Sequence, residues 1–510
     1  MKLLRPCFLA IIAFLYVLPS AATTYYCAPG ALSTGAGTKA DPMAFATAIN
    51  KSIVGGDSII VRGGTYSFSS TLRISKPGTS GNLIHVVAYP GEQPIFDFSL
   101  QAYNSNNQGV LLQGNYVHFK GIIVQGAGDN GLQGTGSYDV IENCVFRWNC
   151  DSGLQMKSGS NNYILNCDSY ENFDYETNGG NADGFADKQY SNTGTNTYEG
   201  CRSWSNSDDG WDSYQLISST IYKNCWCYNM APAQFDMTNH IRYTTDKAVI
   251  DTYTNHIIPN GGNGNGFKLG GATTVHNATL TNCISVSNKV KGFDQNNNAG
   301  TMTIYNCTSY KNGQNYGFSN STNGTLTIKN CASLSSTSSN SFSCPTTESN
   351  NTWDTGLSCS ASDFASLDIS QMLLPRKSDG SLPDITLLHL VSNSAMIDKG
   401  TNVGLPYNNI APDLGAYEYT VASGIETPTV SKLTIYPNPV HDTATLTFDS
   451  SVSGKITIKL LDLTGRILNT QEGDASEGNK ITVECSFLPK GNYLCTITGN
   501  GISAVGKLIK

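Results

Sequence analysis

The 510-residue sequence is poor in charged side chains, since Asp, Glu, Lys and Arg together make up only 14% of it. Acidic residues outnumber basic ones by 39 to 31, which leaves a formal net charge of −8 at pH 7. An acidic protein has no general electrostatic attraction for nucleic acid or for anionic lipid. We therefore expect no nucleic-acid partner, and an anionic substrate would need a local source of positive charge.

Long apolar runs are also missing after the first residues. The opening MKLLRPCFLAIIAFLYVLPSAATTYYC has basic residues, an apolar run and then small residues, which is typical of a secretory signal peptide and predicts one over residues 1–22. No later stretch is apolar for the ~18 residues that a spanning helix needs. We expect an exported protein, secreted or held at the cell surface, with no membrane span, and we expect a monomer.

Cysteine, by contrast, recurs in a regular pattern. Seven cysteines each follow Asn or Gly, at separations of 23, 34, 24, 58, 24 and 24 residues. Short alternating runs such as YVHFKGIIV and TLTIKNCASL indicate strands. A repeating unit of this length with two or three strands is typical of one coil of a parallel β-helix, which predicts an all-β unit of about ten coils over residues 23–420. These cysteines are Cys144, Cys167, Cys201, Cys225, Cys283, Cys307 and Cys331.

The simplest role for these seven cysteines is packing, because a free cysteine behaves as a small buried hydrophobe. Elsewhere in the chain, the pairs Cys344 with Cys359 and Cys485 with Cys495 are better candidates for disulfides in an exported protein.

A second marker, a glycine followed by an apolar residue, recurs once per coil. Two intervals are longer than the others, with about eight residues inserted before Gly184 and about 32 before Gly266. Insertions on one side of a solenoid commonly line its binding face. The pairs are Gly131-Leu132, Gly153-Leu154, Gly184-Phe185, Gly210-Trp211, Gly266-Phe267, Gly292-Phe293 and Gly317-Phe318.

Aligning the coils on this pair brings several carboxylates together. Asp183 and Asp209 precede the glycine on adjacent coils, and Asp208 and Asp212 lie beside Asp209. Such a cluster is strongly repulsive unless a cation lies among the carboxylates. Calcium, a hard cation with six to eight oxygen ligands, fits best, while the lack of nearby His or Cys argues against zinc. Singly, each aspartate is more often a solvated turn residue than a ligand, but the joint pattern predicts a calcium site.

Lys268 falls one coil beyond Asp212, in the glycine-rich stretch NGNGFKLGG. A lysine near a divalent cation has its charged form disfavoured, so that a neutral amine becomes available as a base. The alternative is a plain salt bridge between Lys268 and Asp212. A base, a calcium ion and an anionic sugar together favour β-elimination, in which Lys268 removes the C5 proton of a uronate whose carboxylate is neutralised by calcium.

Residues ~23–420 resemble polysaccharide lyase family 9, the pectate lyases with a right-handed parallel β-helix. The resemblance is carried by GDSIIVRGGTY, AYPGEQPIFDF, NADGFADK, SDDGWD, NGNGFKLGG and APDLGAYEY. It implies calcium-dependent cleavage of α-1,4-linked polygalacturonate, or pectin, an acidic polysaccharide. It also implies Lys268 as the Brønsted base and a calcium ion held by four aspartates, which here are Asp183, Asp208, Asp209 and Asp212.

Two other functions remain open on the sequence. One is a β-helix hydrolase of the polygalacturonase type, which uses paired carboxylates to activate water. Such enzymes carry Gly-His-Gly and Arg-Ile-Lys motifs, whereas none of the seven histidines here lies between two glycines and no Arg-Ile-Lys occurs. The other is a non-catalytic polysaccharide-binding surface protein, which stacked Asn and aromatic residues would support equally well.

The character of the sequence changes near residue 420. TVASGIETPTVS is typical of a linker, placed at 421–430, and the alternating strands of 431–510 predict a small β-sandwich-like domain. This tail resembles the C-terminal sorting domain of the type IX secretion system of Bacteroidetes, on LTIYPNPVHDTATLTF, LLDLTGRIL and LPKGNYLCTITGNGISAVGKLIK. The alternative is a small accessory module that binds carbohydrate.

Overall fold

The computed structural model describes residues 22–190, 194–321, 324–354, 356–357, 359–420, 429–430, 433–448, 455–462, 467–474, 480–499 and 502–510. The chain divides into two compact units, Met1–Tyr419 and Thr420–Lys510. The predicted signal peptide, except for its last residue, and most of the predicted linker lie outside the described residues. None of the helices in the described ranges is long and apolar enough to cross a membrane.

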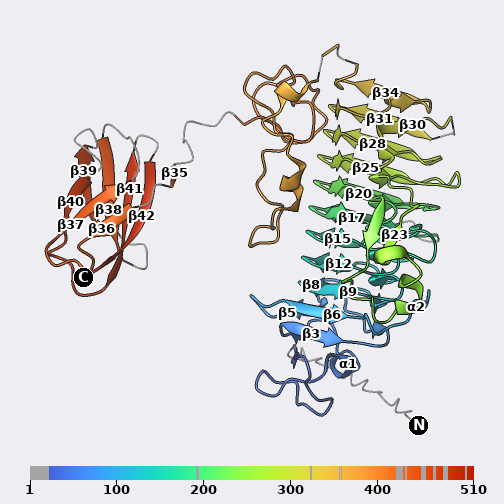
Figure 1. Ribbon diagram of the computed structural model, residues 1–510, viewed down its shortest axis with the longest axis horizontal. Coiled ribbons are helices and arrows are strands. Elements are labelled where there is room, and N and C mark those ends of the chain that lie inside the picture. Colours follow the sequence, from blue (N-terminus) through green and yellow to red (C-terminus); the bar gives the residue numbers. More distant parts are fainter. Residues whose placement is uncertain are drawn as a thin grey trace, which may run out of the picture. The chain divides into compact units, whose positions relative to one another are not determined.

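The first unit is a right-handed parallel β-helix, as predicted, and its stacked coils are visible in Figure 1. Successive coils contribute strands to three long parallel sheets. Sheet 1 contains β1 (Thr24–Cys27), β2 (Ser58–Val61), β5 (Ile84–Ala88), β8 (Val117–Lys120), β11 (Val140–Glu142), β14 (Tyr163–Leu165), β17 (Thr195–Glu199), β20 (Ser219–Lys223), β25 (Asn277–Thr281), β28 (Thr301–Tyr305), β31 (Thr325–Lys329) and β34 (Thr346–Ser349).

The other two sheets complete each coil. Sheet 2 contains β3 (Gly64–Ser67), β6 (Pro94–Asp97), β9 (Ile123–Gln125), β12 (Val145–Arg147), β15 (Asp168–Tyr170), β18 (Arg202–Trp204), β21 (Trp226–Tyr228), β26 (Ile284–Val286), β29 (Thr308–Tyr310) and β32 (Ala332–Leu334). Sheet 3 contains β4 (Leu72–Ile74), β7 (Val110–Leu112), β10 (Leu132–Gly134), β13 (Leu154–Met156), β16 (Phe185–Asp187), β19 (Trp211–Asp212), β24 (Phe267–Lys268), β27 (Lys291–Asp294), β30 (Gln314–Phe318) and β33 (Ser341–Phe342).

An aromatic stack fills the interior behind sheet 3. Neighbouring strands in register place equivalent side chains at the coil spacing. The ring centroids of Phe185, Trp211, Phe267, Phe293 and Tyr316 are therefore 5.1, 4.6, 5.1 and 5.1 Å apart along the stack. This buried column holds the strands of sheet 3 in register, and so it also sets the positions of the outward-facing residues.

The last step of that stack corrects the sequence alignment. The glycine–apolar pair Gly317-Phe318 is predicted to match Gly292-Phe293, but β30 is shifted by two residues, so that Phe293 pairs with Tyr316. The Tyr316 ring is fully buried, and its hydroxyl lies 3.1 Å from the carbonyl oxygens of both Cys307 and Ala332, which share its one donated proton. A satisfied hydroxyl lets tyrosine occupy the core position at little cost.

The seven regularly spaced cysteines are all buried and unpaired, in agreement with a packing role. The two disulfide candidates are wrong, because all four cysteines, Cys344, Cys359, Cys485 and Cys495, are free in the structure. Cys485 and Cys495 belong to the apolar core of the second unit. They pack there as small hydrophobic side chains.

The two insertions pack against each other on one side of the coils. Phe173 of the first insertion stacks on Phe235 of the second, with ring centroids 4.1 Å apart. The second insertion carries β22 (Gln234–Asp236), α2 (Lys247–Ile250), η1 (Thr254–His256) and β23 (Ile257–Pro259). Its fully buried Arg242 pairs with Asp246 and donates hydrogen bonds to the carbonyl oxygens of Gly126 and Gln101. The insertion is thus tied to the β-helix body.

The segment after β34 runs back along another side of the coils (Figure 1) and covers part of sheet 2. It includes η2 (Ala361–Asp363) and η3 (Ile369–Leu373). Arg376 from this segment and Arg202 from β18 both pair with the buried Asp168, at 2.6 and 2.7 Å. At the N-terminal end of the body, α1 (Phe45–Ala48) packs Phe45 against Phe96.

The second unit has two sheets around its own apolar core. One sheet has the strand order β35-β42-β41-β38-β39 and the other β36-β37-β40, and most pairs are antiparallel. Its strands are β35 (Thr429–Val430), β36 (Leu433–Tyr436), β37 (Thr443–Phe448), β38 (Lys455–Leu461), β39 (Ile467–Asp474), β40 (Lys480–Glu484), β41 (Asn492–Gly499) and β42 (Ile502–Ile509).

Candidate active site

The glycines that precede the strands of sheet 3 are required by close packing. A Cβ atom on Gly184 would lie 2.0 Å from Ser203 Oγ, and one on Gly210 would lie 2.3 Å from Cys227 Sγ. Gly266 has the same relation to Ser285 Oγ, at 2.3 Å. These distances are far below a normal contact, so only glycine lets the chain turn tightly into β16, β19 and β24. The recurring glycine therefore marks the start of each strand that carries a site residue.

Strand pairing then confirms the predicted register of the site. Ala186 pairs with Asp212, and Asp212 pairs with Lys268. One position before the glycines, the backbone N–H of Asp209 donates a 3.1 Å hydrogen bond to Asp183 Oδ1. The five residues singled out in the sequence thus lie on three neighbouring coils.

Three of the four predicted aspartates converge on one point. Asp183, Asp209 and Asp212 each offer a carboxylate oxygen, and these oxygens lie within 4.8 Å of one another. Asp208 is not part of this group. Its two oxygens instead accept hydrogen bonds from the backbone N–H groups of Asn263, at 2.6 Å, and Asn181, at 3.2 Å.

Both partners of Asp208 belong to the insertions. Asn181 ends the first insertion and Asn263 the second, so Asp208 joins them to the site. Asp208 therefore lies beside the carboxylate group with its oxygens turned toward the insertions.

The carboxylates differ in how they ionise. Burial raises the pKa of Asp183 well above its usual value, and the neighbouring Asp212 adds to the effect. Burial also raises the pKa of Asp209, to about 7. For Asp212, burial acts in the same direction, but Lys188 and Lys268 outweigh it and lower the pKa. Asp212 is thus the member of the group whose negative charge is best compensated by the protein itself.

Lys268 forms the ion pair with Asp212 that was the alternative to a base role in the sequence analysis, and a second ion pair with Asp209. Its Nζ lies 2.9 Å from Asp209 Oδ2 and 3.4 Å from Asp212 Oδ1. Burial would lower the pKa of Lys268, but Asp209 and Asp212, with Asp183 and Asp208, raise it. Without another cation, the lysine is therefore the counter-ion of the carboxylate group.

A second lysine, Lys188, was not predicted from the sequence. Its Nζ donates a hydrogen bond to Asp212 Oδ2, whereas Lys268 contacts Oδ1, and the Lys188 side chain is largely buried. Both lysine Nζ atoms lie 5.7 Å from the centre of the Tyr214 ring. Strand alternation puts Lys188 on the same outward face as Ala186, the partner of Asp212, and this signal could have found it.

The donor set fits a calcium ion. Calcium binds oxygen ligands at 2.3–2.6 Å, so ligands on opposite sides of the ion are about 4.6–5.2 Å apart. The 4.8 Å limit for the three carboxylates meets this requirement. Asp209 Oδ2 is buried and accepts no well-directed hydrogen bond from a described residue, although Lys268 Nζ lies 2.9 Å away. Such an oxygen has a lone pair left for a metal ion.

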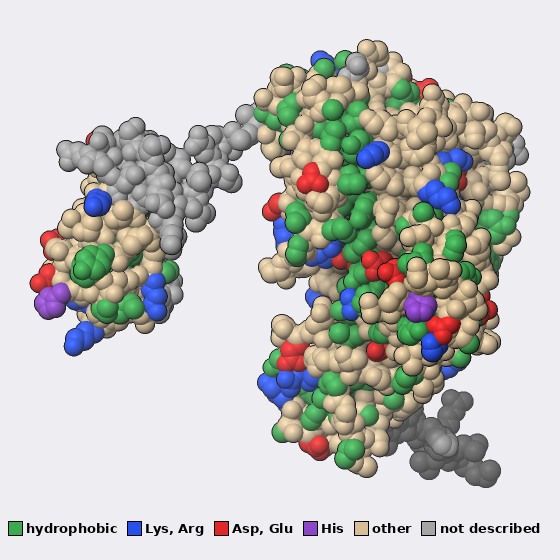
Figure 2. Space-filling view, in the orientation of Figure 1, with side chains coloured by type: hydrophobic (Ala, Val, Ile, Leu, Met, Phe, Trp, Pro, Cys, Tyr) green, Lys and Arg blue, Asp and Glu red, His purple; other side chains and the backbone are tan. Residues whose placement is uncertain are grey.

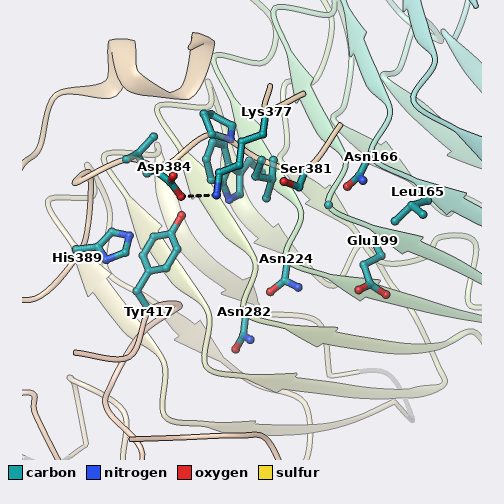
Figure 3. Close-up of a pocket in the computed structure, with 15 residues that line it drawn as sticks. Leu165, Asn166, Glu199, Asn224, Asn282, Lys377, Ser381, Asp384, His389 and Tyr417 are labelled. Atoms are coloured by element: carbon teal, nitrogen blue, oxygen red, sulfur yellow. Dashed lines mark ion pairs between the residues drawn. The ribbon is translucent and has the colours of Figure 1, made fainter. Parts of the chain in front are cut away.

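A cavity of about 360 Å³ opens beside Lys268 and is walled by Tyr214, Asn263 and Lys291. A larger cavity, of about 490 Å³, lies elsewhere, between sheets 1 and 2 and the segment after β34. Figure 3 shows its lining, with Lys377 and Asp384 paired at one edge and His389 beside Tyr417. The larger cavity contains none of the five predicted residues, so size alone does not identify the site.

Comparison with known proteins agrees with the geometry. The family model described as the Pel9A-like, right handed beta helix region matches residues 25–340, which is more than half of the chain. The chain belongs to the Pel9A-like family. A second model, the secretion system C-terminal sorting domain, matches residues 434–510, so the resemblance of the tail is also confirmed.

Relatives of this family cover most of the β-helix unit. Pectate lyase L of Dickeya chrysanthemi is 39% identical over 405 residues, which cover 77% of this chain and 90% of that protein. Pectate lyase L of Paenibacillus polymyxa is 36% identical, covering 69% and 78%. The crystal structure of pectate lyase Pel9A superposes with a TM-score of 0.69 at 36% identity, covering 79% of this chain and 97% of that one.

Proposed function

We propose that the β-helix unit is a calcium-dependent pectate lyase that cleaves α-1,4-linked polygalacturonate by β-elimination. The relatives support the enzyme class, a polysaccharide lyase, over most of the unit's length. The observation that carries the mechanism is the contact of Lys268 with a cluster of buried carboxylates on neighbouring coils. A non-catalytic binding protein would have no need for this costly arrangement of buried charge.

Asp183, Asp209 and Asp212 would hold the calcium ion, with Asp208 as a fourth ligand or as the residue that ties the insertions to the site. When bound, calcium would neutralise the uronate carboxylate and acidify the neighbouring C5 proton. A protein with a net charge of −8 needs such a local positive charge to accept a polyanion.

Lys268 is the proposed base. In the ion-free site its ammonium compensates Asp209 and Asp212, and a neutral amine requires that another cation take over this task. Freed from the carboxylates, the amine would remove the C5 proton, a C4=C5 double bond would form as the C4–O bond breaks, and the departing glycosidic oxygen would take up a proton, which leaves an unsaturated uronide end. Lys188 continues to pair with Asp212 and keeps that carboxylate in place.

The rival is a hydrolase that uses two of the buried aspartates as acid and base. Such an enzyme needs one carboxylate to protonate the glycosidic oxygen and another to activate water. The two lysines that contact Asp212 lower the pKa of this carboxyl and oppose its use as the acid, whereas the raised pKa values of Asp183 and Asp209 are compatible with either reaction.

The two reactions leave different products. Incubation of the protein with polygalacturonate and calcium should produce new chain ends with the ultraviolet absorbance of a conjugated unsaturated uronide. A chelator should stop the reaction, and added calcium should restore it. New reducing ends without that absorbance would establish the hydrolase instead.

The C-terminal domain directs the protein to the outside of the cell or its surface, as its match to a sorting domain indicates. We propose that residues 1–22 are the signal peptide that starts this export and that a type IX secretion system reads the tail. Peptide sequencing of the mature N-terminus tests the first step, which predicts cleavage after Ala22.

A further inference from the structure

The surface of sheet 3 continues beyond Lys268 into a second cavity. The first cavity, beside Lys268, has a volume of about 360 Å³, and the next has about 230 Å³. Lys291, Asp294 and Asn296 line both of them. The two cavities therefore form one continuous groove, which leads from the proposed base across β27 toward β30.

Lys291 is built into the middle of this groove. Gly317, on the next coil, leaves room for its stem, since a Cβ atom there would lie 2.5 Å from Lys291 Cδ and 2.8 Å from Cε. The ammonium group donates a 2.7 Å hydrogen bond to Asp294 Oδ1, and about a quarter of the side chain (26%) is exposed. An ammonium has three donors, so at least one can face a ligand in the groove.

The ion pair of Lys291 with Asp294 has little structural value by itself. A partly exposed pair typically contributes between zero and about 1 kcal/mol to stability. Asp294 also accepts a hydrogen bond from the backbone N–H of Asn296, so its position does not depend on the lysine. The position of the Lys291 ammonium in an open groove is better explained by the binding of an anionic ligand there.

We propose that this groove is a second uronate-binding subsite and that Lys291 binds the carboxylate of the sugar next to the reacting one. The inference rests on the proposed function, because polygalacturonate carries a carboxylate on every residue. A chain extended along the coils would bring its next carboxylate close to Asp294, and without Lys291 the two negative charges would repel each other.

Binding is best measured in a protein that cannot cleave. In a Lys268→Ala background with calcium present, isothermal titration with saturated oligogalacturonates should show about 10- to 100-fold weaker binding after Lys291→Gln, the loss expected for a charge-assisted hydrogen bond. Lys311→Gln is the matched control, since Lys311 is exposed outside the groove, and it should leave binding unchanged.

Two further experiments distinguish a role of Lys291 in carboxylate binding from a purely structural role. Gly317→Ala keeps the charge of Lys291 but displaces its stem, and it should weaken binding by several-fold. Methyl-esterified oligogalacturonates lack the carboxylates, so Lys291→Gln should weaken their binding no more than the control does. Equal losses with free and esterified ligands would overturn the proposal, as would unchanged binding of the free acid.

The kinetics of the cleaving enzyme supply the last arm. Lys291→Gln in the otherwise unaltered protein should raise KM for polygalacturonate and leave kcat nearly unchanged. If the unaltered protein forms unsaturated ends and Lys291→Gln has the same KM, the subsite is wrong while the lyase stands. If no unsaturated ends form at all, the proposed function itself fails.

Discussion

Two stretches of sheet 3 share one backbone design but differ in chemistry. The coils of β10 and β13 have the same glycine–apolar pair and the same register as those of β16, β19 and β24. The coils of β16 and β19 carry Asp183 and Asp209 before the glycine, whereas those of β10 and β13 carry Asn130 and Ser152 there. The proposed site thus differs from its neighbouring coils by a few residues on a repeated frame.

Charge compensation makes the difference sharper. Asp151, on the coil of β13, is partly buried, and burial together with Asp129 raises its pKa well above the usual value. Asp212 is buried, which acts in the same direction, but two lysines lower its pKa. The comparison teaches that two cations from neighbouring coils lower the pKa of Asp212, whereas Asp209, with Lys268 alone beside it among the described residues, keeps a pKa raised by burial.

Figure 2 shows how sparse charge is on the visible surface, which is mainly uncharged polar groups and backbone.

The largest effect is expected from Lys268→Ala, which removes the residue that most separates the two stretches. Loss of a general base typically lowers kcat by about 10²- to 10⁴-fold. The initial rate of unsaturated-end formation at saturating calcium is the measurement. Lys311→Ala, on the exposed surface, is the control, and cleavage by Lys268→Ala at the control's rate would show that another group is the base.

The double substitution Asp183→Ser with Asp209→Asn gives the coils of the proposed site the residue types found at these positions on the coils of β13 and β10. We expect activity to fall by at least about 100-fold, because a metal's charge stabilisation is worth several kcal/mol. Calcium should also stop raising the Tm, since a ligand stabilises only the fold that binds it. Retention of the calcium-dependent rise in Tm would place the ion elsewhere.

A smaller effect is expected from Lys188→Met, which keeps the stem but removes the charge that holds Asp212. Groups that orient a ligand typically change affinity or activity by about 10- to 100-fold. The calcium concentration for half-maximal activity should therefore rise. Lys157 occupies the equivalent position one coil earlier, because Met156 pairs with Asp187, so Lys157→Met is the matched control. Equal behaviour of the two variants would contradict a special role for Lys188.

The smallest effect is expected from ending the chain at Tyr419. The β-helix unit contains all five predicted residues and has its own core, separate from that of the C-terminal unit. The specific activity and Tm of the shortened protein should match those of the full chain. A clear loss of activity would mean that the tail contributes to catalysis.

Much of this organisation could be predicted from the sequence because a parallel β-helix repeats itself. Equivalent positions on successive coils lie side by side, so counting from the recurring glycine was enough to bring Asp183, Asp209, Asp212 and Lys268 together. Glycine recurs at these positions of the sequence because side chains of the next coil leave no room for a Cβ atom. The change in composition near residue 420 likewise marked the second unit.

Other features depended on contacts that periodicity does not record. Tyr316 takes the place of the expected Phe318 in the aromatic stack. Its hydroxyl lies within hydrogen-bond distance of two carbonyl oxygens, which are brought to it by the neighbouring strands. Lys188 reaches Asp212 across a coil, and Asp208 turns toward backbone groups of the insertions. A repeat pattern determines where each Cα lies along the solenoid, whereas the direction of a long or polar side chain is decided by the partners that folding brings to it.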